Sequence, residues 1–163
     1  KTAEVSKVYS YKAFFEEGVL ITRFHDEYFE EEGDKSLLAI CRSMTIDQRL
    51  SIKTVIWDLK DVTAMSVVNT DIARMTHFEK ELLKMFKPLR GNAAQHVKQI
   101  QIFHIPPSDK AVANIFRERL ERVAHSSRKT PRIESDEPWG LPELLESLNL
   151  LKLLSLLDGE WQK

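Results

Sequence analysis

The stretch KTVIWDLKDVTAMSVVNTD, from Lys53 to Asp71, is more informative about the fold than any other part of the chain. Its apolar run at 55–57 is closed by Asp58, and burial on both faces is what a central strand of a helix-covered sheet requires. Loops at the carboxyl ends of such strands are where open α/β sheets bind ligands and partners. The sequence predicts a polar loop of this kind, with Asp58, Lys60, Asp61, Thr63 and Ser66.

A helix start follows this loop. Asn69 or Thr70 is a suitable N-cap, because a side-chain oxygen there accepts a hydrogen bond from the free backbone amides of the first turn. Asp71 would then complement the positive end of the helix dipole. An ordinary capped connection with no other role is the alternative interpretation of these residues.

The composition predicts one soluble globular domain. The chain has 163 residues, of which 42% are apolar and 30% charged, and its formal net charge is -1. These values argue against a disordered or membrane-spanning chain, and the overall charge does not indicate a nucleic-acid partner. Cys41 is the single cysteine, so we expect no internal disulfide and a reducing, cytoplasmic compartment.

Apolar periodicity along the rest of the chain predicts strands that alternate with helices. Glu16-Glu17-Gly18 separates two strand-like runs, which indicates a hairpin in which the glycine takes a positive φ. Ser108 is the expected cap of the helix that follows Pro106-Pro107. The predicted order is strands at 8–15 and 19–24, a helix at 37–44, the strand ending at 58, a helix at 72–89, a strand at 100–105, a helix from 108, a short strand at 131–134 and a helix from 140.

This order predicts an α/β fold. Right-handed crossovers through helices favour a mainly parallel central sheet, and the first hairpin strand would be an antiparallel edge. We expect about four to five helices to cover the sheet.

The element order over residues 8 to 148 resembles the STAS domain, the family named for sulfate transporters and antagonists of anti-sigma factors. Locally, TVIWDLKDVTAM is similar to the family's strand that ends in Asp-Leu and continues into a short valine-containing loop. The resemblance implies a STAS-like layered fold. It also implies a non-enzymatic regulatory role in which the chain binds another protein, as anti-sigma-factor antagonists do.

Regulatory members of this family carry an Asp-Ser pair at the start of the next helix, and phosphorylation of that serine switches protein binding. Counting from Leu59, Ser66 stands at the Asp position and Val67 at the Ser position. The resemblance therefore implies a binding surface without the phosphoserine switch. Ser66 is kept as a minor candidate phosphosite, because a phosphate beside a helix start has strong electrostatic effects.

Few patterns point to catalysis or metal binding. None of the five histidines has a second histidine or a cysteine at metal-ligand spacing, and the glycines form no phosphate-binding loop. We therefore expect no metal and no cofactor. A phosphorelay receiver is the enzyme-like alternative, in which Asp58 would be the phosphoacceptor and Asp26-Glu27 the acidic pair.

The C-terminal segment LNLLKLLSLLDGEWQK has too many leucines for one helix stripe. It is also shorter than the roughly 20 residues that a transmembrane helix needs. We predict a single domain at 1–148 and a Leu-rich helical extension at 149–163, which packs on the domain or on a second copy in a homodimer. The leucines expected to pair in such a dimer are Leu150, Leu151, Leu153, Leu154 and Leu157.

Together these features predict a bacterial-type, cytoplasmic protein-binding module. A small apolar or lipid-like ligand between the sheet and a helix is the alternative, with a lining formed by Met65, Met75, Phe78 and Met85. The surface expected to bind the partner protein comprises Asp61, Thr63, Ser66, Val67, Asn69, Thr70 and Asp71.

Overall fold

The computed structural model describes residues 9–65, 72–126 and 140–162. Its centre is a four-stranded sheet in the order β1-β2-β3-β4. Antiparallel pairing joins β1 (Tyr9–Phe14) to β2 (Val19–Tyr28), and parallel pairing joins β2 to β3 (Thr54–Met65) and β3 to β4 (Gln101–Ile105). The predicted fold class, a mainly parallel sheet with an antiparallel N-terminal hairpin strand, is confirmed. The strand expected at 131–134 lies outside the described residues.

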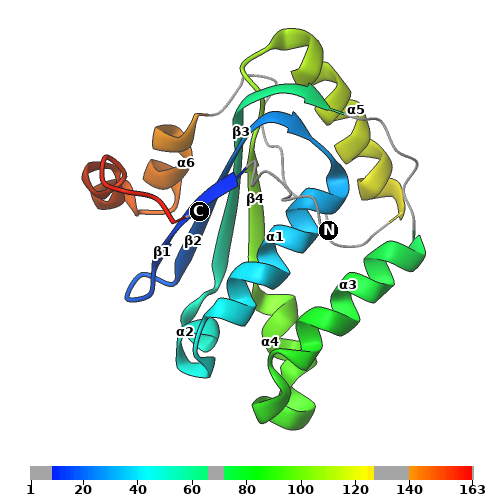
Figure 1. The fold of residues 1–163 in the computed structure, drawn as a ribbon, viewed down its shortest axis with the longest axis vertical. Coiled ribbons are helices and arrows are strands. Elements are labelled where there is room, and N and C mark those ends of the chain that lie inside the picture. Colours follow the sequence, from blue (N-terminus) through cyan, green and yellow to red (C-terminus); the bar gives the residue numbers. More distant parts are fainter. Residues whose placement is uncertain (1–8, 66–71, 127–139, 163) are drawn as a thin grey trace, which may run out of the picture.

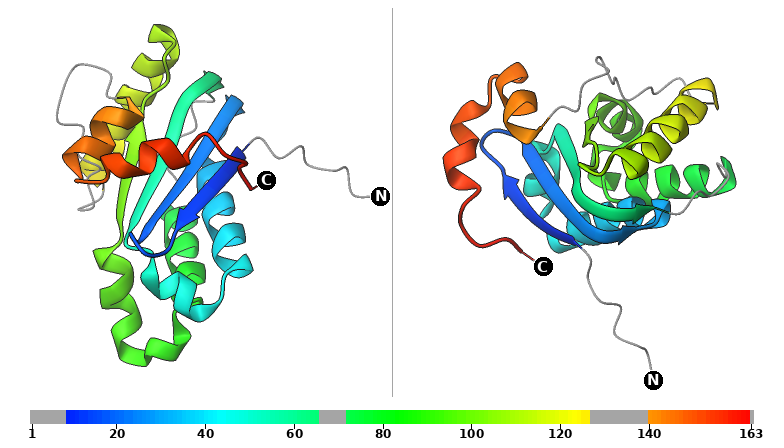
Figure 2. Two further views of the ribbon diagram at one scale, coloured as in Figure 1. Left: turned by 90° about the vertical axis from the view of Figure 1, so that its left-hand side faces the viewer. Right: turned by 90° about the horizontal axis from the view of Figure 1, so that it is seen from above.

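Helices cover both faces of the sheet (Figure 1), and the views in Figure 2 show the two layers separated by the strands. The first face carries α1 (Glu30–Ser43), α2 (Ile46–Ser51), α3 (Ile72–Lys84), the 3-10 helix η1 (Lys87–Asn92), α4 (Ala93–Gln99) and α5 (Lys110–Ser126). The second face carries α6 (Leu141–Ser147) and the 3-10 helix η2 (Leu151–Leu156).

The alternation of side chains along the strands divides the core into two clusters. The cluster on the first face includes Leu20, Phe24, Val55, Trp57 and Leu59 from the strands, packed with residues of α1, α3, α4 and α5. The cluster on the second face includes Val19, Ile21, Ile56 and Ile105, packed with residues of α6 and the C-terminal segment. Burial on both faces explains why these strands read as continuous apolar runs.

The loop predicted after Asp58 is wrong, because β3 continues to Met65. β2 also extends beyond its predicted end, to Tyr28, and stays paired with β3. Leu59 and Val62 are 0% and 1% exposed, so the chain continues to bury apolar side chains after the charged position. The charge at position 58 does not end the strand, since it is paired inside the sheet as described below.

The single long helix predicted at 72–89 is also wrong. α3 ends at Lys84, η1 follows with Arg90 at a positive φ of 53°, and α4 then begins. α4 buries only Ala93 and Val97 of its seven residues, so its sequence carries a weak helical pattern. Pro88 and the strained Arg90 conformation interrupt the helix between α3 and α4.

The prediction that Ser108 caps α5 is wrong, because the cap is Asp109. Asp109 performs this role, with its Oδ1 accepting a hydrogen bond from the Val112 amide at 3.1 Å. Ser108 instead donates its amide and its hydroxyl to the Lys60 carbonyl, at 3.1 and 3.0 Å. The sequence contains two adjacent capping residues, and tertiary contact decides between them.

The C-terminal segment packs on the second face of the sheet. Leu153 is fully buried and Leu157 is 9% exposed, whereas Leu151 is 47% and Leu156 is 53% exposed. Leu150 and Leu154 pack partly buried against the same cluster. Pairing between the tails of two copies stays a prediction, and the exposed leucines are the ones available to it.

A row of polar side chains crosses the first face. Thr22, Trp57 and His104 are direct neighbours in the register of β2, β3 and β4. The His104 ring lies 5.0 Å from that of Trp57 and 5.4 Å from that of Phe116, between ring centroids. Burial lowers the pKa of His104 to about 4, so this imidazole is neutral near pH 7.

We expect the free energy of unfolding to decrease as the pH is lowered below about 6.5, because of His104. Its pKa lies near 6.5 when unfolded and at about 4 when folded, so below pH 6.5 only the unfolded chain takes up the proton. The free energy of unfolding should drop by about 3 kcal/mol between pH 6.5 and 4 through this group. His104→Phe should remove that part of the slope in urea unfolding at several pH values, and an unchanged slope in the variant would contradict this role of His104.

The packing of the C-terminal segment can be tested by truncating one buried leucine. Leu153→Ala should lower the free energy of unfolding by about 3 kcal/mol, because it leaves a cavity in the second-face cluster. Leu151→Ala, at a half-exposed position of the same helix, should change it by less than about 0.5 kcal/mol. Equal effects of the two substitutions in urea unfolding would contradict this packing.

Candidate functional site

Two strands extend past their neighbours at the carboxyl-terminal end of the sheet. Within the described residues β1 begins opposite Phe24 and β4 ends opposite Asp58, but β2 and β3 stay paired as far as Tyr28 and Met65. We name this protruding part, residues 25–28 and 59–65, the ribbon end. Figure 1 shows its two strands curving together over the top of the sheet toward α5.

Two bulges shape the ribbon end. The pairing shifts between Arg23 and His25 and again between Asp26 and Glu27, and each time β3 contains one extra residue. Asp26 has a left-handed φ of 62°, a conformation that Asp and Asn adopt more readily than most residues. Bulges bend a strand and increase its twist. As a result, three consecutive side chains from His25 to Glu27 are exposed.

The buried carboxylate of Asp58 fixes the start of the ribbon end. Its Oδ1 accepts a hydrogen bond from the Lys60 amide at 3.1 Å, and its Oδ2 accepts one from Arg23 Nε at 3.3 Å. The Lys60 carbonyl in turn accepts the two hydrogen bonds from Ser108. The backbone groups that the first bulge removes from the ladder are thereby satisfied, and the ribbon end is tied to the connection between β4 and α5.

The same environment contradicts a phosphoacceptor role for Asp58. Its side chain is 3% exposed and each of its oxygens is already engaged. Burial raises the pKa of the Asp58 carboxyl, and the Lys60 amide and the Arg23 guanidinium act against that rise. The proposed acidic pair, Asp26 and Glu27, lies beyond the bulge on the exposed ribbon end. The arrangement serves the structure of the sheet, and the receiver alternative is dropped.

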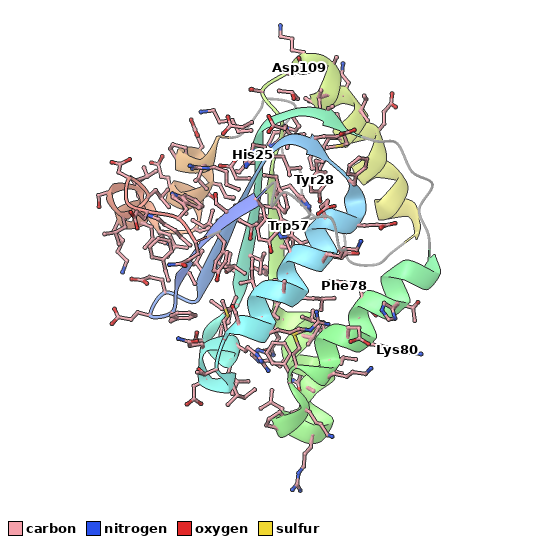
Figure 3. All side chains as sticks on the ribbon, in the orientation of Figure 1. His25, Tyr28, Trp57, Phe78, Lys80 and Asp109 are labelled. Carbon is pink, nitrogen blue, oxygen red and sulfur yellow. The ribbon has the colours of Figure 1, made fainter. Side chains whose placement is uncertain are left out.

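The ribbon end presents polar side chains on a buried base. Tyr28 and Val62 are 6% and 1% exposed and anchor its two strands in the first-face cluster. Figure 3 shows His25 where the ribbon end leaves the sheet, Tyr28 further along it, and Trp57 lower in the sheet. Thr63 Oγ1 donates to the Asp26 carbonyl at 3.3 Å, across the strands. The exposed groups are therefore held on a defined frame.

The structure places only part of the predicted surface. Asp61 and Thr63 are exposed on β3, on the ribbon end and not in a loop. Ser66, Val67, Asn69, Thr70 and Asp71 lie outside the described residues. The sequence interpretation missed that the run from His25 to Glu27 belongs to this surface. Three charged or polar residues in succession break the alternation of a strand, and this was the available signal for a bulge.

The lining predicted for an apolar ligand belongs largely to the core. Met85 is 7% exposed inside the first-face cluster, and Met65 and Phe78 pack partly buried against that cluster. Figure 3 shows Phe78 on α3, and the side chain of Met75 is outside the described set. Binding of such a ligand stays a prediction.

Within the ranges 9–65, 72–126 and 140–162, no group of three or more His, Cys, Asp or Glu side chains is arranged to hold a metal ion. No helix in those ranges combines the length and the apolar character needed to cross a bilayer.

Comparison with known proteins finds similarity to solved structures but not to families or curated proteins. No protein-family model and no curated protein matches the sequence. The chain is similar to the solved structure of the anti-sigma factor antagonist SpoIIAA in its unphosphorylated form, with 12% sequence identity and a TM-score of 0.33. The similarity covers 71% of this chain and 97% of SpoIIAA.

Removing Arg23 should destabilise the protein strongly at neutral pH. Arg23→Met leaves the Asp58 carboxylate buried without its partner, which should cost about 3 kcal/mol in the free energy of unfolding at pH 7. The loss should shrink in acid, because the pKa of Asp58 rises further without the guanidinium and the protonated carboxyl carries no charge.

Urea unfolding of the wild type and the variant at pH 7 and pH 4.5 measures both effects. The matched control is Arg42→Met, which removes an exposed pair with Glu81 at 3.8 Å and should change stability by less than about 0.5 kcal/mol. A loss for Arg23→Met that is the same at both pH values would show that Asp58 does not govern it.

Proposed function

We propose that this chain is a non-enzymatic regulatory module that binds another protein through the ribbon end. The observation that carries the proposal is the extension of β2 and β3 beyond the described residues of β1 and β4, with exposed polar side chains on a buried base. Binding residues are commonly presented in this way, on irregular segments positioned by a rigid scaffold. The resemblance of the sequence to STAS domains supports a regulatory role for this chain, exerted through binding to another protein.

The charge of the ribbon end supports a partner with a cationic surface. Three carboxylates, Asp26, Glu27 and Asp61, are exposed there against one exposed ammonium, that of Lys60, and His25 Nδ1 lies 3.1 Å from Asp26 Oδ2. Complementary charge across an interface speeds encounter and fixes the docked orientation. The proposal includes no serine phosphorylation step, because the position that matches the family's phosphoserine is Val67.

A charge reversal tests the surface. We expect the full chain, immobilised as bait, to retain a protein from a lysate of its native cells. Asp61→Lys should reduce that retention about tenfold, because it places like charges across the interface. Retention by the wild type should also weaken as the salt concentration rises, since salt screens exposed charges.

Glu146→Lys is the matched control, because it reverses an exposed charge on α6, on the opposite face of the sheet. It should leave retention unchanged. Loss of retention with both variants, or with neither, would contradict binding at the ribbon end. Circular dichroism and thermal unfolding of each variant establish that the fold is intact.

A further inference from the structure

The outer edge of β1 is partly occupied by the chain's own C-terminal segment. The Tyr11 amide donates to the Gln162 carbonyl at 2.8 Å, and the Gln162 amide donates to the Tyr11 carbonyl at 2.9 Å. This is an isolated antiparallel bridge on the side of β1 away from β2. A single residue pair shows that the edge accepts an extended chain running antiparallel to β1.

The same edge remains open two residues further on. Backbone groups in an antiparallel strand point alternately to the two sides, so the amide and carbonyl of Ala13 face the same edge as those of Tyr11. In the described part of the chain, no backbone hydrogen bond is made to Ala13 from that side. Ala13 therefore offers one donor and one acceptor to an added strand.

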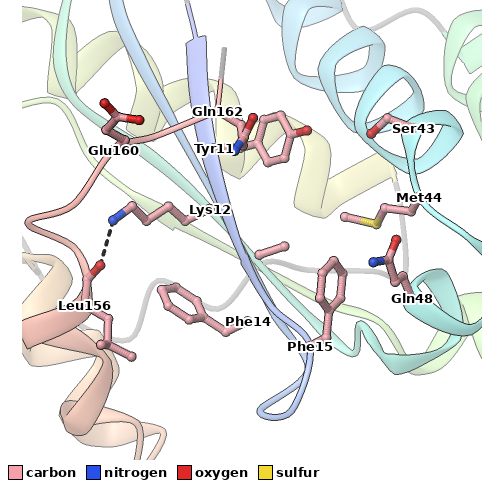
Figure 4. Close-up of a pocket in the computed structure, with 11 residues that line it drawn as sticks. Tyr11, Lys12, Phe14, Phe15, Ser43, Met44, Gln48, Leu156, Glu160 and Gln162 are labelled. Atoms are coloured by element: carbon pink, nitrogen blue, oxygen red, sulfur yellow. Dashed lines mark hydrogen bonds between the residues drawn. The ribbon is translucent and has the colours of Figure 1, made fainter.

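A cavity of about 380 Å³ adjoins this open edge. Figure 4 shows its walls on both sides of β1: Phe15 lies toward Met44 and Gln48, and Phe14 lies on the side of Leu156. Strand addition uses backbone hydrogen bonds for affinity and alternating side-chain pockets for specificity. The cavity supplies apolar contacts from Phe15 and Met44 on one face of an added strand and from Phe14 and Leu156 on the other, among polar lining residues.

An aromatic side chain secures the segment that occupies the edge. The Trp161 ring centroid lies 4.2 Å from the Arg23 guanidinium carbon and 5.5 Å from Lys12 Nζ. Cations over an aromatic face are attracted by its quadrupole. The Trp161 indole also donates to the Leu157 carbonyl at 3.0 Å, and Lys12 Nζ donates to the Leu156 carbonyl at 2.6 Å. The contacts of this segment define the chemistry that the edge recognises.

The attached segment makes fewer backbone hydrogen bonds to β1 than the open edge has groups to form. Residues 158–160 and Gln162 are exposed, and one residue pair makes both of the backbone hydrogen bonds. A longer strand would pair with Ala13 as well as Tyr11 and would fill the cavity. The attached segment benefits from a high effective concentration, which for a short tether is in the millimolar range. A free segment must therefore make better contacts to replace it.

We propose that the β1 edge binds an extended segment of a partner protein by strand addition, antiparallel to β1, and that residues 158–162 are its intramolecular competitor. The bound segment carries an aromatic side chain at the place of Trp161, over Arg23 and Lys12. It carries an apolar side chain at the place of Glu160, opposite Ala13 and directed toward Phe15. This surface is separate from the ribbon end.

The test uses a synthetic peptide and the full chain. The peptide is acetyl-Asp-Gly-Leu-Trp-Gln-Lys-amide, which is the sequence from Asp158 to Lys163 with Glu160→Leu. The protein is Trp161→Ala, which lacks the ring that secures the attached segment. Titration followed by ¹H–¹⁵N correlation spectra should show saturable shifts of the Tyr11 and Ala13 amides, with affinity about tenfold higher than for the wild type.

Two controls decide the outcome. The same peptide with alanine in place of its tryptophan should cause no shifts, because it lacks the ring for Arg23 and Lys12. If Trp161→Ala does not fold, Gln162→Pro takes its place, since it removes the amide that bonds to Tyr11 and keeps Trp161. Absence of shifts at Ala13 in a folded variant, or equal shifts from both peptides, would overturn the proposal.

Discussion

The buried carboxylate of Asp58 is the constraint on which the rest of the structure depends. It lies on a strand that is covered on both faces, where an unpaired charge would be unfavourable. Arg23 of β2 and the Lys60 amide of its own strand satisfy its two oxygens. One side chain therefore joins the central strands and stabilises the bulge from which the ribbon end begins. The direction of the ribbon end follows from this carboxylate.

The two faces of the sheet serve different purposes around this centre. The first face carries the larger cluster, beneath α1, α3, α4 and α5. It also carries the row of Thr22, Trp57 and the neutral His104. The second face is closed by α6 and the C-terminal segment, and Trp161 stacks there on the outer side of Arg23. Trp161, which lies 103 residues after Asp58 in the sequence, thus covers the Arg23–Asp58 ion pair. This contact couples the C-terminal segment to the centre of the sheet.

The sequence predicts the fold class well because apolar periodicity reports burial directly. It locates the hairpin of β1 and β2, the two further strands β3 and β4, and the helix that opens after Gly140. It fails where a tertiary contact overrides a local signal. From the sequence alone, Asp58 predicts the end of a strand, but its ion pair with Arg23 allows the strand to continue. Ser108 likewise predicts a helix cap, but its hydroxyl donates to the Lys60 carbonyl instead. The extent of the candidate surface depends on these long-range contacts, so local patterns could not define it.

The bulges and the positive φ of Asp26 also bear on solubility. A protruding pair of strands with flat edges is a template on which further chains can add without limit, and this is a route to fibrils. Here the extra residues in β3 increase the twist, and the exposed polar and acidic side chains from His25 to Glu27 stand along the edge of the described strand pair. Non-specific growth of the sheet is discouraged at this end by shape and by charge. The irregular geometry thus makes a projecting strand pair a poor template for further strands.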